Sequence, residues 1–151
     1  MAVRLTREQL NQMWRQAHAE APNECCGVLL GRGEIVELVF PGRNVHETPR
    51  TRYNMQDADL LRVNQLQDER EWDLVGIYHS HPETKPEPSV TDKFMAAYPD
   101  ACYVIMSMRD LTHPEVRAWR IADKIGGDGN PVKDAAGRIV KEATEEEVVV
   151  T

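Results

Sequence analysis

The sequence lacks the features that would place a protein in a membrane or outside the cell. No apolar run approaches the ~18 residues needed to cross a bilayer. The first residues carry neither a long apolar core nor a small-residue cleavage pattern, so we expect no signal peptide. Only three cysteines are present, an odd number at spacings that do not suit a disulfide framework. We therefore expect a cytoplasmic protein with reduced thiols and no membrane partner.

An excess of basic residues is also missing. The chain has 18 Lys and Arg against 25 Asp and Glu, a formal net charge of −7. Nucleic-acid-binding domains usually present a basic face, so this acidity argues against nucleic acid as a partner. The apolar share of 41% and the charged share of 28% are ordinary for a globular protein. Because 151 residues are the size of one domain, we expect a single domain over residues 1–151.

The apolar pattern predicts helices mixed with short strands. Thr6 and Gln9 have the spacing of a capping box, which predicts a helix over residues 7–20. Further helices are expected over 57–70 and 89–98. Short apolar runs predict strands over residues 25–30, 35–40, 74–78, 101–108 and 116–121. This mixture indicates an α/β fold in which helices cover a sheet.

Several polar segments connect or follow these elements. Residues 122–138 are rich in Gly and Asp and are expected to form a flexible loop. Residues 139–151 predict either a terminal strand or an acidic tail, since a charge run is most often a solvated face. A basic loop carries Arg43, Arg50 and Arg52, which are either solvated or grip the tail or carboxylate of a substrate.

Two histidines at the end of a predicted strand are the main chemical signal. His79 and His81 are two residues apart, so on a strand they point to the same face, about 6.6 Å apart at the backbone. That spacing lets both imidazoles reach one zinc ion at about 2.0–2.1 Å. The proline-rich residues 82–88 end the strand and let Asp92 return with a carboxylate. Three protein ligands leave a fourth position open for water, which is typical of a catalytic zinc site.

The same residues resemble the motif of the JAMM (MPN-plus) metalloproteases. The shared pattern is His79-Ser-His81-Pro, a seven-residue spacer, Ser89-x-x-Asp92, and an upstream Glu24-Cys-Cys-Gly. The resemblance covers roughly residues 5–121 and implies a central curved mixed β-sheet flanked by helices, similar to the cytidine-deaminase fold. It also implies one Zn²⁺ held by His79, His81 and Asp92. By the same resemblance Glu24 is the general acid/base, and Ser89 helps hold the tetrahedral intermediate.

Short connections and the absence of a second ligand cluster resemble the small prokaryotic form of this family. Outside the motif, His18, His46 and His113 have no close ligand spacing. Members of the small form are associated with ubiquitin-like β-grasp sulfur-carrier proteins that end in Gly-Gly. The resemblance thus implies a zinc-dependent peptidase or isopeptidase that cleaves after this Gly-Gly. Its product would be a cysteine, a peptide or a conjugated protein.

Each of these residues also has a simpler explanation. A His-x-His pair can be a polar strand end, Ser89 and Asp92 can be a helix capping box, and Glu24 can be an ordinary loop acid. A nucleophilic role for Cys25 or Cys26 would need a nearby base and a depressed pKa, so packing in a strand is favoured.

For the whole protein, two other functions compete with a peptidase. One is a non-catalytic MPN-type interaction module, but members of that kind lack the metal ligands that are complete here. The other is a zinc hydrolase of small amides or nucleobases. Zinc deaminases of that fold use a Cys-x-x-Cys pair, which this sequence does not contain.

Overall fold

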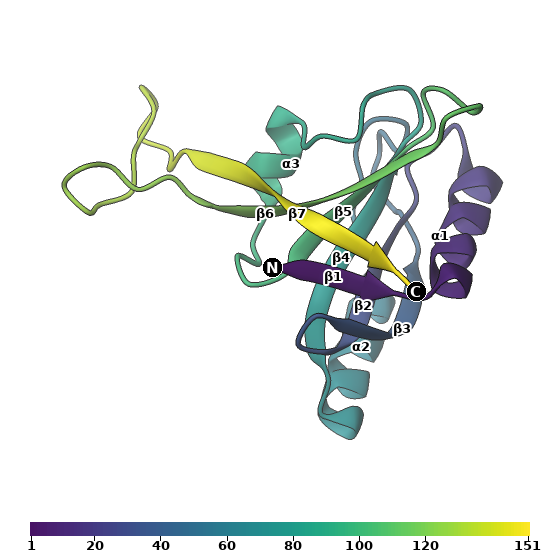
Figure 1. Ribbon diagram of the computed structural model, residues 1–151. Coiled ribbons are helices and arrows are strands. Elements are labelled where there is room, and N and C mark those ends of the chain that lie inside the picture. Colours follow the sequence, from purple (N-terminus) through teal and green to yellow (C-terminus); the bar gives the residue numbers. More distant parts are fainter.

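A computed structural model describes residues 1–151 as seven strands and three helices arranged around one curved sheet (Figure 1). The strands are β1 (Ala2–Leu5), β2 (Cys26–Arg32), β3 (Ile35–Gly42), β4 (Asp73–His81), β5 (Cys102–Ser107), β6 (Glu115–Asp123) and β7 (Lys141–Val150). The helices are α1 (Arg7–Glu20), α2 (Asp57–Arg70) and α3 (Val90–Met95). The capping box predicted at the start of α1 is present, since Thr6 and Gln9 exchange both hydrogen bonds.

The sheet is mixed and closes on itself. Its strand order is β1-β3-β2-β4-β5-β6-β7, and β7 returns to pair with β1. The β1/β3, β1/β7 and β4/β5 pairs are parallel, and the other pairs are antiparallel. The predicted α/β architecture, a curved mixed sheet flanked by helices, is confirmed.

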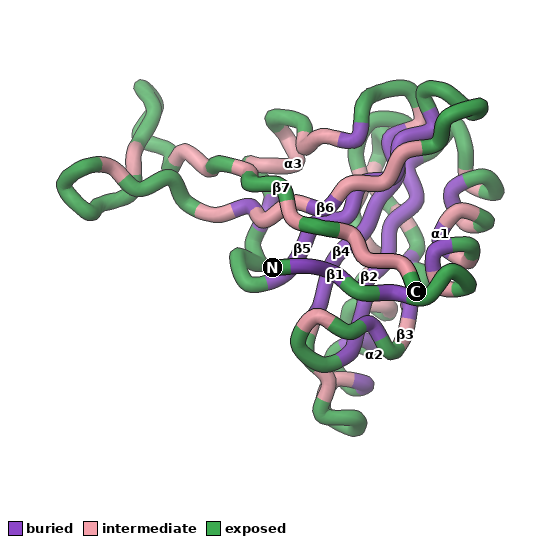
Figure 2. The backbone as a smooth tube through the Cα atoms, viewed as in Figure 1, coloured by how far each residue is buried: buried purple, intermediate pink, exposed green.

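The helices cover two different faces of the sheet. On one face, Leu10 and Met13 of α1 join the larger apolar cluster. On the other face, Val63 and Leu66 of α2 join a smaller cluster that includes Ile77 of β4. Figure 2 shows that the buried residues concentrate on β2, β4 and β5, the middle of the sheet. The side chains that β4 turns toward α2 therefore lie in a largely enclosed layer.

Two strands differ from the expectations drawn from the sequence. Strand β1 was not expected, because it pairs with β3 and β7 far along the chain and four residues give little local signal. The expected strand over 74–78 continues to His81, so both histidines lie within β4. Helix α2 itself matches the expected range, and it buries Val63 and Leu66, whereas Leu60 and Leu61 are exposed.

Helix α3 is also shorter than the expected range of 89–98. It ends at Met95, because the backbone N–H groups of Ala97 and Tyr98 donate to the Tyr103 hydroxyl at 3.1 and 3.2 Å. These bonds replace helical ones and turn the chain back toward β5.

The segment between β6 and β7 extends away from the sheet (Figure 1). Isolated bridges join Ile125 to Pro131 and Lys133 to Ile139, so this segment forms two successive small turns. Most of its residues are exposed (Figure 2). No helix in the chain is long and apolar enough to cross a membrane.

Gly27 allows β2 to lie directly against the ring of Tyr78, which is fully buried. A Cβ at position 27 would lie 2.3 Å from the Tyr78 ring. We expect Gly27→Ala to lower the free energy of unfolding by about 1–3 kcal/mol, because the core must shift to accept the methyl group. Gly127→Ala is the matched control, since a Cβ there meets no atom within 4 Å. Equal unfolding free energies for the two variants in denaturant titrations would contradict this packing.

Candidate metal centre

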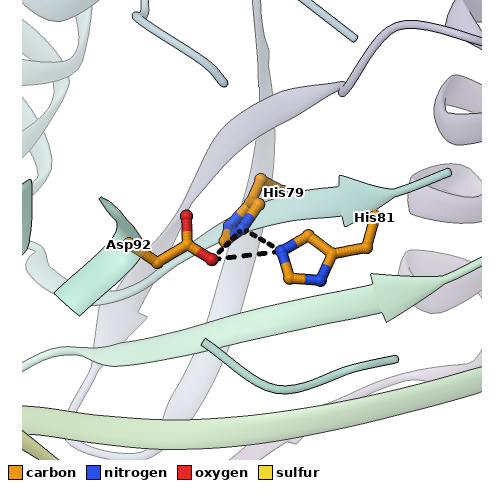
Figure 3. Close-up of side chains that lie close together, drawn as sticks. All are labelled: His79, His81 and Asp92. Atoms are coloured by element: carbon orange, nitrogen blue, oxygen red, sulfur yellow. Dashed lines mark hydrogen bonds and ion pairs between the residues drawn. The ribbon is translucent and has the colours of Figure 1, made fainter. Parts of the chain in front are cut away.

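The end of β4 places His79 and His81 side by side on the face that α2 covers. Ile77, two residues earlier, packs in the cluster beneath α2, and the alternation of a strand turns 79 and 81 the same way. Both histidines are buried, with exposed fractions of 1% and 4%. Their Nε2 atoms lie 3.0 Å apart (Figure 3).

Asp92, in the first turn of α3, faces the two imidazoles. Its Oδ2 lies 3.2 Å from Nε2 of His79 and 3.1 Å from Nε2 of His81 (Figure 3). The helix start fixes this carboxylate: Ser89 N–H donates to Asp92 Oδ2, and Asp92 N–H donates to Ser89 Oγ, each at 3.0 Å. Ser89 and Asp92 therefore do form a capping box, the simpler role that the sequence offered for them. The same box also orients the Asp92 carboxylate toward the histidines.

The loop of residues 82–88, between β4 and α3, is tied to three strands. The carbonyls of residues 84–86 accept, in order, from Ser107 Oγ at 2.6 Å, His81 Nδ1 at 2.8 Å and Trp119 Nε1 at 2.9 Å. These donors lie on β5, β4 and β6. The loop that carries the chain from the histidines to Asp92 thus has a defined path.

The three donor atoms match what a tetrahedral metal requires. They lie 3.0–3.2 Å from one another, and ligands at zinc–ligand distances of about 2.0–2.1 Å are separated by about 3.3 Å. Because His81 Nδ1 donates to a carbonyl, the lone pair of that ring lies on Nε2, facing the other donors. His79, His81 and Asp92 form the only group of three or more potential ligands that converges in this way.

Protonation of the three groups also favours ligation. Burial lowers the pKa of His79, so its imidazole is neutral near pH 7. Burial opposes ionisation of Asp92, but hydrogen bonds to both histidines outweigh it and hold the Asp92 pKa well below its usual range. Burial also disfavours charge on His81, yet bonds to Asp92 and the Lys85 carbonyl raise its pKa. The surroundings of His81 thus favour a positive charge, which a metal ion bound at Nε2 would supply in place of the proton.

Glu24 lies next to this group because of the pairing between β2 and β4. Cys26 pairs with His79 in the antiparallel ladder, so Glu24, two residues earlier, lies on the same face as the histidines. Its backbone is held on both sides: the N–H donates to the Pro49 carbonyl at 2.7 Å, and the C=O accepts from Asn44 Nδ2 at 3.0 Å.

The Glu24 carboxyl is buried, and one of its oxygens has no hydrogen-bond partner. Its side chain is only 5% exposed, and its Oε1 has no hydrogen-bond partner in the protein. Burial raises the pKa of Glu24 to about 8; the charge of His81 lowers it and that of Asp92 raises it further. A carboxyl with such a pKa can both accept and release a proton near neutral pH, as a general acid/base must.

A cavity of about 490 Å³ opens beside Asp92, between α2 and α3. Its walls are mainly apolar and include Tyr53, Met55, Leu60, Ile77, Met95 and Tyr98. His46 and Arg52 also line it. Of the three arginines in the predicted basic loop, only Arg52 reaches the cavity, whereas Arg50 forms a long, exposed ion pair with Glu83 at 3.8 Å.

The remaining sequence candidates are two cysteines next to Glu24 and an exposed histidine. Cys25 and Cys26 are fully buried, and burial raises the pKa of each thiol to about 12, which disfavours a nucleophilic thiolate. His113 is exposed and contacts Asp110. These positions fit the structural roles that the sequence favoured for the cysteines and for a loop histidine.

Asn44 is a residue that the sequence analysis missed. Its Nδ2 donates to the carbonyls of Glu24 and Arg52, and its Oδ1 accepts from the N–H groups of His46 and Asn54, all at 3.0 Å. The amide thus uses its full hydrogen-bonding capacity to join three stretches of backbone. An asparagine in a polar loop is common, and no pattern in the sequence could have distinguished this one.

Comparison with known proteins gives a family and named relatives. The family model for prokaryotic homologues of the JAB domain matches residues 6–122. A CysO-cysteine peptidase from Mycobacterium tuberculosis is 37% identical over 116 residues, which cover 76% of this chain and 79% of the relative. A desampylase from Haloferax volcanii is 37% identical over 114 residues, covering 70% of this chain and 82% of the relative.

Solved structures share the architecture. A protein from Desulfitobacterium hafniense has a TM-score of 0.76 and 29% identity, with 100% of this chain and 93% of that chain covered. A JAB1/MPN domain protein from Archaeoglobus fulgidus has a TM-score of 0.53 and 16% identity, with 99% of both chains covered, and thus shares the fold.

Proposed function

Since the chain belongs to the prokaryotic homologues of the JAB domain, the small prokaryotic form of the JAMM family, we propose that it is a zinc-dependent peptidase or isopeptidase. Its substrate in this proposal is a ubiquitin-like sulfur-carrier protein, cleaved after the C-terminal Gly-Gly. The main support is the convergence of three donor atoms, from two buried histidines and the half-buried Asp92, beside a Glu24 carboxyl oxygen that has no hydrogen-bond partner.

The relatives support the class of reaction and of substrate. One is named a CysO-cysteine peptidase and another a desampylase, and the chain covers about four-fifths of each. We extend the proposal to a single JAMM domain over residues 1–151, because β7 closes the sheet against β1. A cytoplasmic location agrees with three free, buried cysteines.

In this mechanism His79, His81 and Asp92 would hold the zinc ion. Zinc supplies a Lewis acid that polarises a carbonyl and makes water a better nucleophile at neutral pH. Glu24 takes the proton of the attacking water and passes it to the leaving amine, for which a pKa near neutrality is suited. The Ser89 hydroxyl, which accepts from Asp92 N–H, keeps its own hydrogen to donate to the oxyanion of the substrate.

The roles of base and ligand can be separated by two substitutions. Glu24→Gln should keep zinc and lower kcat by about 10²–10⁴, because the amide cannot accept a proton. His81→Ala should lose both zinc and activity, because it removes one of three ligands. Metal analysis and turnover of a carrier fused through Gly-Gly to a short peptide measure the two effects. Wild-type turnover in the Gln variant would remove Glu24 from the mechanism.

Ser89 has a capping role and a proposed oxyanion role, which respond differently to substitution. Ser89→Ala should lower stability by about 1 kcal/mol through loss of the cap. It should also lower kcat by about 10²–10³ through loss of the donor. Ser89→Thr, which keeps the hydroxyl, is the matched control and should retain most activity. A Ser89→Ala protein with a lower Tm but unchanged kcat would leave Ser89 as a cap alone.

The substrate assignment predicts a preference for glycine at the cleaved bond. Glycine has no side chain, so its backbone can approach the buried donors closely. Replacing the Gly-Gly of a folded β-grasp carrier fusion by Ala-Ala should slow cleavage by about 10²-fold, the effect of a misplacement of about 1 Å. Mass spectrometry of the products measures this. Equal cleavage of the Ala-Ala fusion, or faster digestion of unfolded casein, would refute the substrate and leave the zinc site untouched.

A further inference from the structure

The two histidines of the centre are held in different ways. His81 donates from Nδ1 to the Lys85 carbonyl at 2.8 Å, a bond that fixes its ring plane. His79 has no such bond: its Nδ1 is buried and has no hydrogen-bond partner in the protein. A histidine that binds metal almost always has its second nitrogen bonded, because that bond orients the ring. Something else must orient His79.

The ring of Tyr53 lies against His79. Their centroids are 4.6 Å apart and the planes are inclined by 26°, a stacked arrangement. His81 meets His79 edge-on, at 4.9 Å and 62°. The Tyr53 face is therefore the surface that opposes rotation of the His79 ring out of its plane.

Tyr53 is itself held firmly, although it lies in a loop. Asn44 bonds to the carbonyl of Arg52 and to the N–H of Asn54, the residues on either side of Tyr53. The Asn54 carbonyl in turn accepts a hydrogen bond from the Val45 N–H at 2.8 Å. Hydrogen bonds thus hold the backbone on both sides of Tyr53 and fix the point from which its ring projects.

We infer that Tyr53 is a positioning residue of the metal centre, which holds His79 in its ligating orientation by ring stacking in place of a hydrogen bond. The inference rests on the proposed zinc site. Stacking needs the aromatic face and not the hydroxyl, and the Tyr53 hydroxyl makes no hydrogen bond in the protein. Without the ring, His79 must be ordered by the ion itself, which weakens binding.

The alternative is that Tyr53 serves only as a wall of the cavity. Tyr53 does line it, as does Tyr98, which is 52% exposed and does not stack on a histidine. A wall residue would alter substrate binding and leave zinc affinity unchanged. The two tyrosines therefore make a matched pair that separates the roles.

The experiment measures the zinc dissociation constant by competition with a chromophoric chelator for the wild type, Tyr53→Phe, Tyr53→Leu, Tyr53→Met and Tyr98→Leu. We expect Tyr53→Phe and Tyr98→Leu to bind as the wild type does. Tyr53→Leu and Tyr53→Met should bind about 10–100-fold more weakly, the usual cost of losing a residue that orients a ligand. The visible spectrum of the Co²⁺-substituted proteins should change in the same two variants.

Thermal unfolding of the metal-free variants shows whether each is folded at the assay temperature. Folded Tyr53→Leu and Tyr53→Met proteins with wild-type affinity would overturn the inference, as would an equal loss in Tyr98→Leu. A wild type that binds no zinc would instead overturn the proposed function.

A second measurement needs no variant. In the NMR spectrum of the zinc-bound wild type, the ring protons of His79 should be shifted upfield of those of His81 by the Tyr53 ring current. Ordinary shifts for His79 would overturn the inference even if every Tyr53 variant failed to fold.

Discussion

The pairing of β2 with β4 is the interaction on which the candidate site depends. The ladder places Cys26 beside His79, and Cys25 and Ser80 follow as the next pair. Cys25 N–H donates to Ser80 Oγ at 2.8 Å, and Ser80 N–H donates to the Cys25 carbonyl at 3.1 Å. These two bonds extend the register by one residue before the start of β2. Glu24 consequently stands on the histidine face, and a slip of one residue would turn it away.

Because side chains alternate along a strand, the two faces of β4 have different roles. Tyr78 and Ser80 point toward α1, where they lock the strand into the core and tie it to β2. His79 and His81 point toward α2 and α3, where the cavity opens. The site brings together two buried histidines, the buried Glu24 and the half-buried Asp92, an arrangement that is costly unless the charges are compensated. The site lies at the end of β4, the middle strand of the sheet.

The sequence predicted the periodic parts of this arrangement well. The capping boxes at Thr6 and Ser89, the length of α2 and the shared face of the two histidines follow from local spacing. Strand β1 was not predicted, because its partner strands lie at distant points in the chain. The end of α3 was not predicted, because it is set by hydrogen bonds to the Tyr103 hydroxyl. The roles of Tyr53 and Asn44 were not predicted for the same reason. The stacking of Tyr53 and the four hydrogen bonds of the Asn44 amide depend on tertiary contacts.

In the proposed function, one metal ion is held by two imidazoles and one carboxylate at the end of β4. X-ray absorption of the zinc-loaded protein tests it directly. The claim predicts one zinc per chain, nitrogen and oxygen neighbours at about 2.0–2.1 Å, and the outer-shell scattering of two imidazole rings. Sulfur neighbours at about 2.3 Å would instead place the ion on a buried cysteine, and protein that takes up no zinc after reconstitution would contradict the claim outright.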